Sequence, residues 1–406
     1  MKPKTVLSLE QALSMTYATL RFVHQGWRVI RLEATPSGNS SQPGDPNRYI
    51  GKEIAEPDRH AYYVAPNVGK EAIALNLKSE EGKEALKCII QELDVDVFCC
   101  NTIPTRYETL GIDYETLCAV KPDLIWAGIS AMGPDYPDVA GYDPMIQAMS
   151  GYMELTGYHD GPPTISGIPL VDLKAGDEIY AGVLAAMVER LESGKGKRID
   201  VSMLQAAASW LITTLPLIDM DCEPEEITRW GNAHRKFIPS NIYPTSRGFI
   251  YVAMGSNAQW NRFCATEMFS SLGAGGRRNT AEIRYKERKS IYREIGKITS
   301  RHTGSEISNV LNTAKVPNNR INNVQDVHNL EAIKRKSTTT NLPNGQEVQM
   351  QPMATDIENA PAHFPMAPRY GEHSLAILEE AGYSQQQRSA MLNKGIIAVP
   401  NNVEVT

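Results

Sequence analysis

The chain has 406 residues, of which 42% are hydrophobic and 22% are charged, and its formal net charge is -6 at pH 7. This length gives room for two or three domains with ample core, and the composition is that of an ordinary globular protein. The acidic balance and the lack of a long basic block argue against nucleic acid or an acidic membrane as a partner.

Targeting and metal signals are also missing from the sequence. No stretch reaches the length of a membrane-spanning helix, and the start, MKPKTVLSL, lacks the apolar core of a signal peptide. The six cysteines show neither CxxC pairs nor metal-ligand spacing, and the histidines form no HExxH pattern. We therefore expect a cytoplasmic protein with free thiols and no bound metal.

The first third of the chain alternates short apolar runs with helical patterns. Strands are predicted at Thr5–Leu9, Trp27–Ala34, Ala72–Leu77, Val95–Cys100 and Leu124–Ile129, and helices at Glu10–Gln25 and Glu80–Leu93. This alternation is typical of the parallel sheet of a doubly wound, Rossmann-like α/β domain. The turn after the first strand has no GxGxxG sequence, so we do not expect a dinucleotide site there.

The middle of the chain has a different character and predicts a smaller α+β domain. Its predicted elements are β-like runs at Ser240–Tyr243 and Phe249–Met254 and helices at Ile283–Ile298 and Gly304–Thr313. The basic residues of Arg284–Arg288 are interrupted by acidic ones and fit a solvated helix face. We expect the large domain to comprise residues 1–223 and 326–406, with the small domain at residues 224–325.

The stretch Gly157–Gly176, GYHDGPPTISGIPLVDLKAG, joins a loop rich in Gly, Pro, Ser and Thr to a predicted helix at Leu173–Leu191. Asp172 then occupies the N-cap position, where the helix dipole and unpaired N–H groups favour its ionised form. A carboxylate of low pKa held by a rigid helix can attack an acyl group as a nucleophile. Taken alone, the pattern also fits a carboxylate that only caps the helix.

Several separated segments have the order and spacing of motifs from one enzyme family. They are Lys70–Gly82, Gly141–Asp143, Asp160–Gly176, Gly194–Met203 and Ala367–His373. Together they resemble the class III CoA-transferases, the family of formyl-CoA transferase and the carnitine CoA-transferases. The resemblance implies a large domain that is discontinuous in sequence, interlocked dimers, and a nucleophilic Asp at the position of Asp172. It also implies coenzyme A as part of the substrate, with no tightly bound cofactor.

The same resemblance points to residues beside the nucleophile. Asp143 matches an acidic position of the family, and it also fits a simple cap of a helix at Pro144–Tyr152. Tyr142 stands where the racemase branch of the family has a histidine, and a tyrosine is a weak base near pH 7. A racemase acting on an acyl-CoA is therefore a less favoured alternative.

Residues for the CoA end of the substrate also come from the resemblance. Asn101 and Lys78 match the family, and Arg106 lies one turn from a position where the family has an arginine. His234, in GNAHRKF, matches a loop near the acyl pocket, and on its own it fits a surface residue that makes hydrogen bonds. The family's other CoA-contact positions are altered, at Leu13, Ser14, Ala34 and Thr109.

We therefore expect an enzyme that moves CoA from an acyl-CoA, with succinyl-CoA a plausible donor, to a carboxylic acid larger than formate. An aryl-substituted dicarboxylate is one candidate acceptor, because the altered CoA contacts fit the branch of benzylsuccinate CoA-transferase. That branch contains two related subunits, so the expected assembly is either a homodimer or a heteromer with a related chain. A non-catalytic subunit of such a heteromer is a further alternative, against which the retained Asp172 argues.

Overall fold

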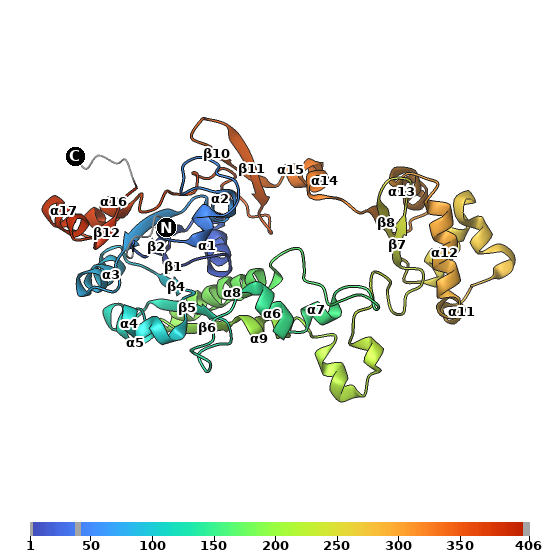
Figure 1. The fold of residues 1–406 in the computed structure, drawn as a ribbon, viewed down its shortest axis with the longest axis horizontal. Helices are drawn as coiled ribbons and strands as arrows, with labels where there is room; N and C mark the ends of the chain where they lie inside the picture. The colour runs from blue at the N-terminus through green and yellow to red at the C-terminus, as the bar shows by residue number, and fades with distance from the viewer. Residues whose placement is uncertain (1–2, 37–41, 401–406) are drawn as a thin grey trace. The chain divides into compact units, whose positions relative to one another are not determined.

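The computed structural model describes residues 3–36 and 42–400 (Figure 1). Its contacts divide the chain into two compact units, which we call the large unit (residues 1–150, 167–212 and 332–406) and the small unit (residues 151–166 and 213–331). The domain boundaries expected at 223/224 and 325/326 stay a prediction. In the contact-based division the small unit also contains the loop that precedes Asp172.

The large unit is built on a seven-stranded sheet with the strand order β12-β3-β2-β1-β4-β5-β6 (Figure 1). The strands are β1 (Thr5–Leu9), β2 (Arg28–Glu33), β3 (Glu71–Leu75), β4 (Val97–Cys100), β5 (Ile125–Ser130), β6 (Arg198–Ser202) and β12 (Ile397–Ala398). Strands β1 to β6 are parallel, whereas β12 pairs antiparallel with β3 at one edge. The predicted α/β class is confirmed, and all five predicted strands form. The order 3-2-1-4-5-6 reverses direction between β1 and β4.

Helices cover both faces of this sheet because its strands are apolar on both sides. On one face, α3 (Glu80–Glu92), α5 (Tyr114–Val120) and α16 (Ser374–Glu380) share a core with Leu7 and alternate residues of the neighbouring strands. On the other face, α1 (Ser14–His24) and α8 (Leu170–Ser193) pack against each other. Val6, next to Leu7, is also fully buried, as expected when successive side chains point to opposite faces.

The remaining elements of the large unit surround this framework. They are α2 (Ala61–Asn67), α4 (Tyr107–Leu110), α6 (Asp143–Met149), α9 (Met203–Ser209), α17 (Gln385–Asn393) and the antiparallel hairpin of β10 (Ser337–Asn341) and β11 (Glu347–Pro352). The helix predicted from Glu10 begins only at Ser14. Ala12 has φ = +56°, a left-handed conformation that cannot belong to a right-handed helix.

The small unit has a three-stranded antiparallel sheet of β7 (Asn241–Pro244), β8 (Phe249–Val252) and β9 (Asn318–Arg320). Its helices are α7 (Tyr152–Leu155), α10 (Asn257–Cys264), α11 (Ala281–Lys286), α12 (Arg288–Thr299), α13 (Gly304–Thr313) and α14 (Val324–Asn329), and α15 (Glu331–Lys334) follows them. Short 3-10 turns along the whole chain lie at Pro46–Tyr49, Pro104–Arg106, Leu215–Met220, Pro224–Glu226, Glu267–Leu272 and Ala274–Gly276.

Two predictions for the small unit are wrong. The single helix expected at Ile283–Ile298 is two helices, because Glu287 leaves helical geometry and pairs with the buried Arg278 at Nε–Oε2 2.8 Å. Arg284 is not on a solvated face but is buried. Its Nε donates to the carbonyl oxygen of Ile238 at 3.1 Å, and its guanidinium lies over the Trp260 ring.

Candidate active site

Asp172 lies in the first turn of α8, which begins at Leu170 after Pro169. The predicted N-cap position of Asp172 is therefore wrong, because the helix starts two residues earlier than its apolar pattern indicates. Pro169 occupies the N-cap position and has no side-chain oxygen with which to satisfy the free N–H groups of the first turn.

Asp143 supplies the missing cap from another helix. Its Oδ2 accepts hydrogen bonds from the backbone N–H groups of Val171, at 2.8 Å, and Asp172, at 3.1 Å. Its Oδ1 accepts from Nε2 of Gln147 at 2.5 Å. Asp143 is the first residue of α6 and is buried, so the cap of its own helix is not its function. These hydrogen bonds place Asp143 beside Asp172, whereas a role of Asp143 in binding substrate stays a prediction.

Burial and the neighbouring carboxylate of Asp143 control the charge of Asp172. Burial, and then the negative charge of Asp143, raise the pKa of Asp172 to about 7. The low pKa expected from an N-cap is therefore wrong, because Asp143 and not Asp172 receives the N–H groups. Among the residues that the structure describes, the Asp172 carboxylate has no hydrogen-bond or ion-pair partner. It is thus a half-buried carboxylate that is about half ionised near neutral pH.

A cavity of about 720 Å³ opens at the carboxyl ends of β1, β2, β3 and β4. Lys78 and Arg106 both line it, together with Asn76 and with Ala140 from the segment before Asp143. Ligands of doubly wound sheets bind at this edge, where the strand order reverses. The structure thus brings together two of the predicted CoA-contact residues, both cationic and able to face phosphates.

The floor of this cavity contains the carboxylates Glu10, Glu33 and Asp45, which sequence reasoning missed as a group. Each is buried and paired with a buried cation: Nζ of Lys70 with Oε1 of Glu10 at 2.8 Å, Nη2 of Arg31 with Oδ2 of Asp45 at 2.9 Å, and Nη2 of Arg48 with Oε2 of Glu33 at 2.5 Å. The floor is therefore neutral as a whole. The signal was present in β2, where Arg31 and Glu33 interrupt an apolar strand.

Burial and pairing compete in setting the pKa values of this network. Burial of Glu33 opposes its ionisation, but the charges of Arg48 and Arg31 outweigh it and lower the pKa to about 2. Burial lowers the pKa of Lys70 to about 8, against the attraction of Glu10. The pairs are held by excellent geometry, which a buried ion pair needs to offset the loss of water.

Asn101 and Tyr142, both predicted to contact CoA, do not line the cavity at the carboxyl ends of the strands. The Asn101 side chain accepts from N of Gln11 at 3.1 Å and donates to O of Gln11 at 2.7 Å. It therefore joins the end of β4 to the loop after β1 and shapes the edge of the cavity. The Tyr142 side chain is 75% exposed and does not line the cavity. Contact of either residue with CoA stays a prediction.

His234 lies in the small unit, in the loop before β7. Its Nδ1 is 3.0 Å from the backbone N atoms of both Lys236 and Phe237 and accepts from them, so the ring proton belongs on Nε2. The ring packs beside Phe237, at 4.3 Å between centroids. These local contacts fit the simpler expectation of a surface residue that makes hydrogen bonds, and a role in the acyl pocket stays a prediction.

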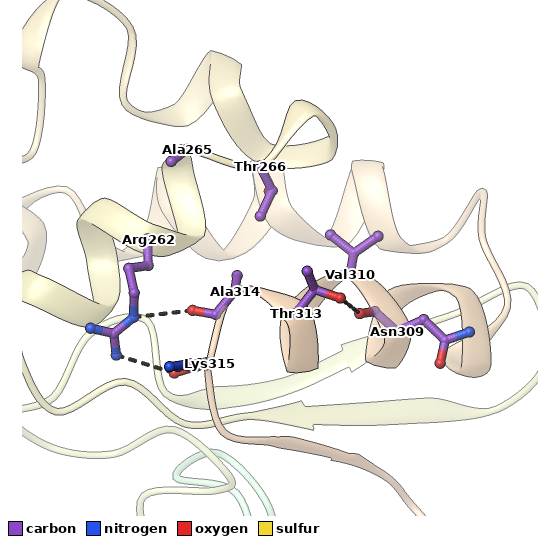
Figure 2. A pocket seen from close by; sticks show the side chains of 8 residues that line it. All are labelled: Arg262, Ala265, Thr266, Asn309, Val310, Thr313, Ala314 and Lys315. Atoms are coloured by element: carbon purple, nitrogen blue, oxygen red, sulfur yellow. Dashed lines mark hydrogen bonds between the residues drawn. The ribbon is translucent and has the colours of Figure 1, made fainter.

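A second cavity, of about 810 Å³, lies in the small unit between α10 and α13 (Figure 2). Arg262 donates there from Nε to O of Ala314 and from Nη2 to O of Lys315, at 3.0 and 3.1 Å. The other lining residues are two alanines, two threonines, a valine, an asparagine and Lys315, so the described lining of this cavity contains no carboxylate. This cavity therefore gives no reason to move the predicted catalytic site away from Asp172, whose role stays a prediction.

Within residues 3–36 and 42–400, no group of three or more His, Cys, Asp or Glu side chains is arranged to hold a metal ion. In the same part of the chain, no helix has the length and apolar character needed to span a membrane.

Comparison with known proteins gives a family and several relatives. The profile of CoA-transferase family III matches residues 1–374. The human succinyl-CoA:glutarate CoA-transferase is 27% identical, covering 97% of this chain and 88% of its own. The succinyl-CoA:mesaconate CoA-transferase of Haloarcula hispanica is 28% identical, covering 93% and 95%. The crystal structure of a CAIB/BAIF family protein from Brucella suis superposes with a TM-score of 0.82 at 26% identity, covering 93% and 98%.

Proposed function

The chain belongs to CoA-transferase family III, and from this premise we propose that it moves CoA from succinyl-CoA to a second dicarboxylic acid, with Asp172 as the nucleophile. The relatives named above act on succinyl-CoA with glutarate or mesaconate as the acceptor, which supports dicarboxylates on both sides. Such a transfer exchanges one thioester for another and requires no ATP. The expectation that this chain lies near the branch of benzylsuccinate CoA-transferase remains a prediction. An aryl-substituted dicarboxylate is therefore kept among the acceptors to be tested.

The reaction follows from the chemistry of a carboxylate and a thioester. An oxygen of Asp172 attacks the thioester carbonyl carbon, the C–S bond breaks, and a mixed anhydride and CoA thiolate form. The thiolate then attacks the Asp172 carbonyl carbon, which releases succinate and leaves an aspartyl-CoA thioester. The acceptor carboxylate attacks this thioester and expels the thiolate, and the thiolate attacks the acceptor carbonyl of the new anhydride. Asp172 is regenerated as a carboxylate.

The unpaired carboxylate of Asp172 beside the capped end of α8 is the observation that carries this proposal. A nucleophile held by a cation or by hydrogen bonds would lose reactivity, and no such partner faces Asp172 in the described part of the chain. Its pKa of about 7 leaves a reactive fraction ionised at neutral pH while making it a stronger nucleophile than an ordinary Asp. Asp143 keeps the first turn of α8 ordered without occupying the Asp172 oxygens.

The cavity at the carboxyl ends of the strands supports CoA binding in the same unit. Lys78 and Arg106 offer two cations to the phosphates, and the paired floor adds no net charge. Its volume of about 720 Å³ falls in the range of sites for small molecules and cofactors. We propose that this cavity holds the nucleotide end of the acyl-CoA.

We also propose that the active assembly is a homodimer. Large apolar side chains are exposed along the segment from residue 210 to residue 220, where Ile212 is 76%, Ile218 57% and Met220 70% accessible. A run of this kind is costly in water and usually marks an interface. A heteromer with a related chain would cover the same residues and is distinguished by experiment.

Intact-mass analysis after incubation with succinyl-CoA tests the function. The wild-type chain is expected to gain a CoA adduct that hydroxylamine removes, whereas Asp172→Ala gains none. Asp177→Ala is the matched control, because this carboxylate lies on the same helix and pairs with Arg21. Glutarate, mesaconate and an aryl-substituted dicarboxylate are then compared as acceptors.

Two results would contradict the proposed reaction, and a third would contradict the proposed homodimer. An Asp172→Ala chain that still forms the adduct would exclude Asp172 as nucleophile. A wild-type chain that forms no adduct but exchanges the α-proton of an acyl-CoA would favour the racemase. If CoA transfer appeared only after addition of a related subunit, the chain would be part of a heteromer.

A further inference from the structure

The loop that leads into Asp172 belongs by its contacts to the small unit, although it interrupts the large one. Residues 151–166 leave the large unit after α6 and return to it at residue 167, three residues before α8 begins. The base of this excursion is closed by the hydrogen bonds from Val171 and Asp172 to Asp143. The conformation of its far part therefore depends on what holds it within the small unit.

Arg229 makes the strongest contacts to this loop. Its Nη1 pairs with Oε2 of Glu154 at 2.6 Å, and its Nε donates to the carbonyl oxygen of Gly161 at 2.9 Å. Thr228 adds a hydrogen bond from Oγ1 to Oε1 of Glu154 at 2.8 Å. The Arg229 side chain is only 17% exposed, so its fork is committed to these contacts. A planar guanidinium suits such a double contact better than the single charge of lysine.

Gly231 continues the same contact with the backbone. Its N–H donates to the carbonyl oxygen of Gly157 at 2.8 Å, and Nδ2 of Asn232 donates to the hydroxyl of Tyr158 at 2.8 Å. Gly231 has φ = +75°, and a Cβ there would lie 2.7 Å from the Tyr158 ring. Only glycine permits this approach. Residues 228–232 therefore clamp the loop at both its helical turn and its tip.

We infer that Arg229 is a positioning residue for the loop that leads into Asp172, an inference that rests on the proposed function. With the tip held by Arg229 and the base closed by Asp143, only a short connection separates the clamped loop from α8. This limits the conformations open to the first turn of α8, where the Asp172 carboxylate must meet the thioester. Orientation of this kind contributes strongly to rate, and small displacements of a reacting group are costly.

Rates of CoA loading, together with hydrogen exchange, test this role. Arg229→Ala is expected to lower the rate constant for loading by about 10- to 100-fold while the KM for succinyl-CoA changes less than twofold, because Arg229 does not line the cavity that we assign to CoA. Exchange of the amides in residues 151–166 should rise. Arg229→Lys, which keeps the charge but loses the fork, should fall between Arg229→Ala and wild type.

Arg262→Ala is the matched control, since it also removes an arginine that bonds two sites of the small unit, the carbonyls of Ala314 and Lys315 (Figure 2). It should leave loading and exchange in 151–166 unchanged. If Arg229→Ala fails to fold, Glu154→Gln weakens the same ion pair more gently and is measured in its place. A variant that frees the loop in exchange but loads CoA at the wild-type rate would overturn the inference, as would a loop whose exchange does not change. A wild-type chain that never loads CoA would instead overturn the proposed function.

Discussion

At the scale of single residues, the candidate site depends on how two carboxylates share one helix terminus. Asp143 takes the free N–H groups of α8, and Asp172 is left with burial and a negative neighbour. Asp172 therefore ionises at higher pH than an ordinary Asp, because burial and a negative neighbour both disfavour its charged form. This division leaves one carboxylate as the hydrogen-bond acceptor of the first turn and the other as the proposed nucleophile.

The pH dependence of the loading reaction follows from this division. Because the carboxylate form of Asp172 attacks, kcat/KM for succinyl-CoA should rise with pH through a pKa near 7 and be lost below it. Asp143→Asn removes the negative neighbour, so the rise should move to lower pH. Asp138→Asn, at an exposed carboxylate nearby in the sequence, is the control and should leave the profile unchanged. A profile that does not move in Asp143→Asn would show that burial alone sets the pKa.

The same raised pKa predicts a pH-dependent gain of stability in Asp172→Asn. The folded state holds the Asp172 proton up to about pH 7, while the unfolded chain releases it near the ordinary aspartate pKa of 3.8. Ionisation therefore favours unfolding increasingly between these values, and the amide removes that cost. We expect Asn to stabilise the chain by about 1–3 kcal/mol at pH 8 and by almost nothing below pH 4. Chemical denaturation at both pH values measures this, and a variant that is less stable at pH 8 would contradict it.

At the scale of elements, the helix that carries Asp172 is held by a close contact with α1. A Cβ at Gly176 would lie 2.7 Å from the backbone oxygen of Ser14 and 2.8 Å from the Tyr17 ring. Glycine thus lets the two helices approach, and no local sequence pattern predicts this close contact because it depends on the position of the partner helix α1. The contact fixes α8, and with it the first turn that bears Asp172.

Gly176→Ala should therefore destabilise the chain although alanine favours helices. Overpacking against a backbone oxygen costs about 1–3 kcal/mol, which exceeds the gain in helix propensity of roughly 1 kcal/mol. Gly182→Ala on the same helix is the control, since its Cβ would meet only a methyl group of Ile199 at 3.2 Å. Thermal melts should show a lower midpoint for the first variant and an unchanged or higher midpoint for the second. Equal midpoints would mean that α1 and α8 can move apart to accept the added methyl group without lowering the stability of the chain.

Some of the helices and strands could be predicted from local sequence patterns, and others could not. Apolar runs located β1 to β5, and the helix at Gly304–Thr313 forms with the predicted bounds. The start of α8 was misplaced because its first turn, Leu170 to Asp172, lacks a capping side chain of its own and is capped by Asp143, 27 residues or more away in the sequence. β12 has only two residues and depends on pairing with β3, so no local pattern could predict it.

The residues that line the cavity could likewise be predicted only in part from the sequence. Lys78 and Arg106 were found through resemblance, and both line the cavity. Nothing in the sequence around Arg31 and Glu33 indicates that they are buried, because charged residues are rarely buried without partners. Their partners Asp45 and Arg48 lie 14 and 15 residues further along the chain. Only the folded chain shows that these charges neutralise one another.

At the scale of the whole molecule, the chain crosses between its two units at four points, after residues 150, 166, 212 and 331. The last segment completes the large unit: N of Tyr370 donates to Oδ2 of Asp58 at 2.6 Å, and its hydroxyl to O of Ala34 at 2.8 Å. Neither end of the chain can therefore form the large unit alone. The crossing segment at residues 210–220 contains five exposed large apolar side chains: Trp210, Ile212, Leu215, Ile218 and Met220.

This exposed segment predicts a dimer that depends on apolar contacts. Light scattering after size exclusion should give twice the chain mass of 44.9 kDa for the wild-type protein. Ile212→Asp with Ile218→Asp places two charges where a partner would bury side chains that are 76% and 57% exposed in the single chain. Burying an unpaired charge costs several kcal/mol, so the double variant should shift to the single-chain mass.

The control is Ile283→Asp, which places a charge at an apolar residue on α11 that is 38% exposed and lies outside this segment. It should keep the dimer mass. Circular dichroism of each variant separates dissociation from unfolding, since a dissociated but folded chain keeps its helical signal. A wild-type chain of 44.9 kDa would contradict the homodimer, and a change to twice that mass only after a related subunit is added would favour the heteromer. CoA loading measured on the dissociated variant then decides whether the nucleophile of one chain needs a second chain to react.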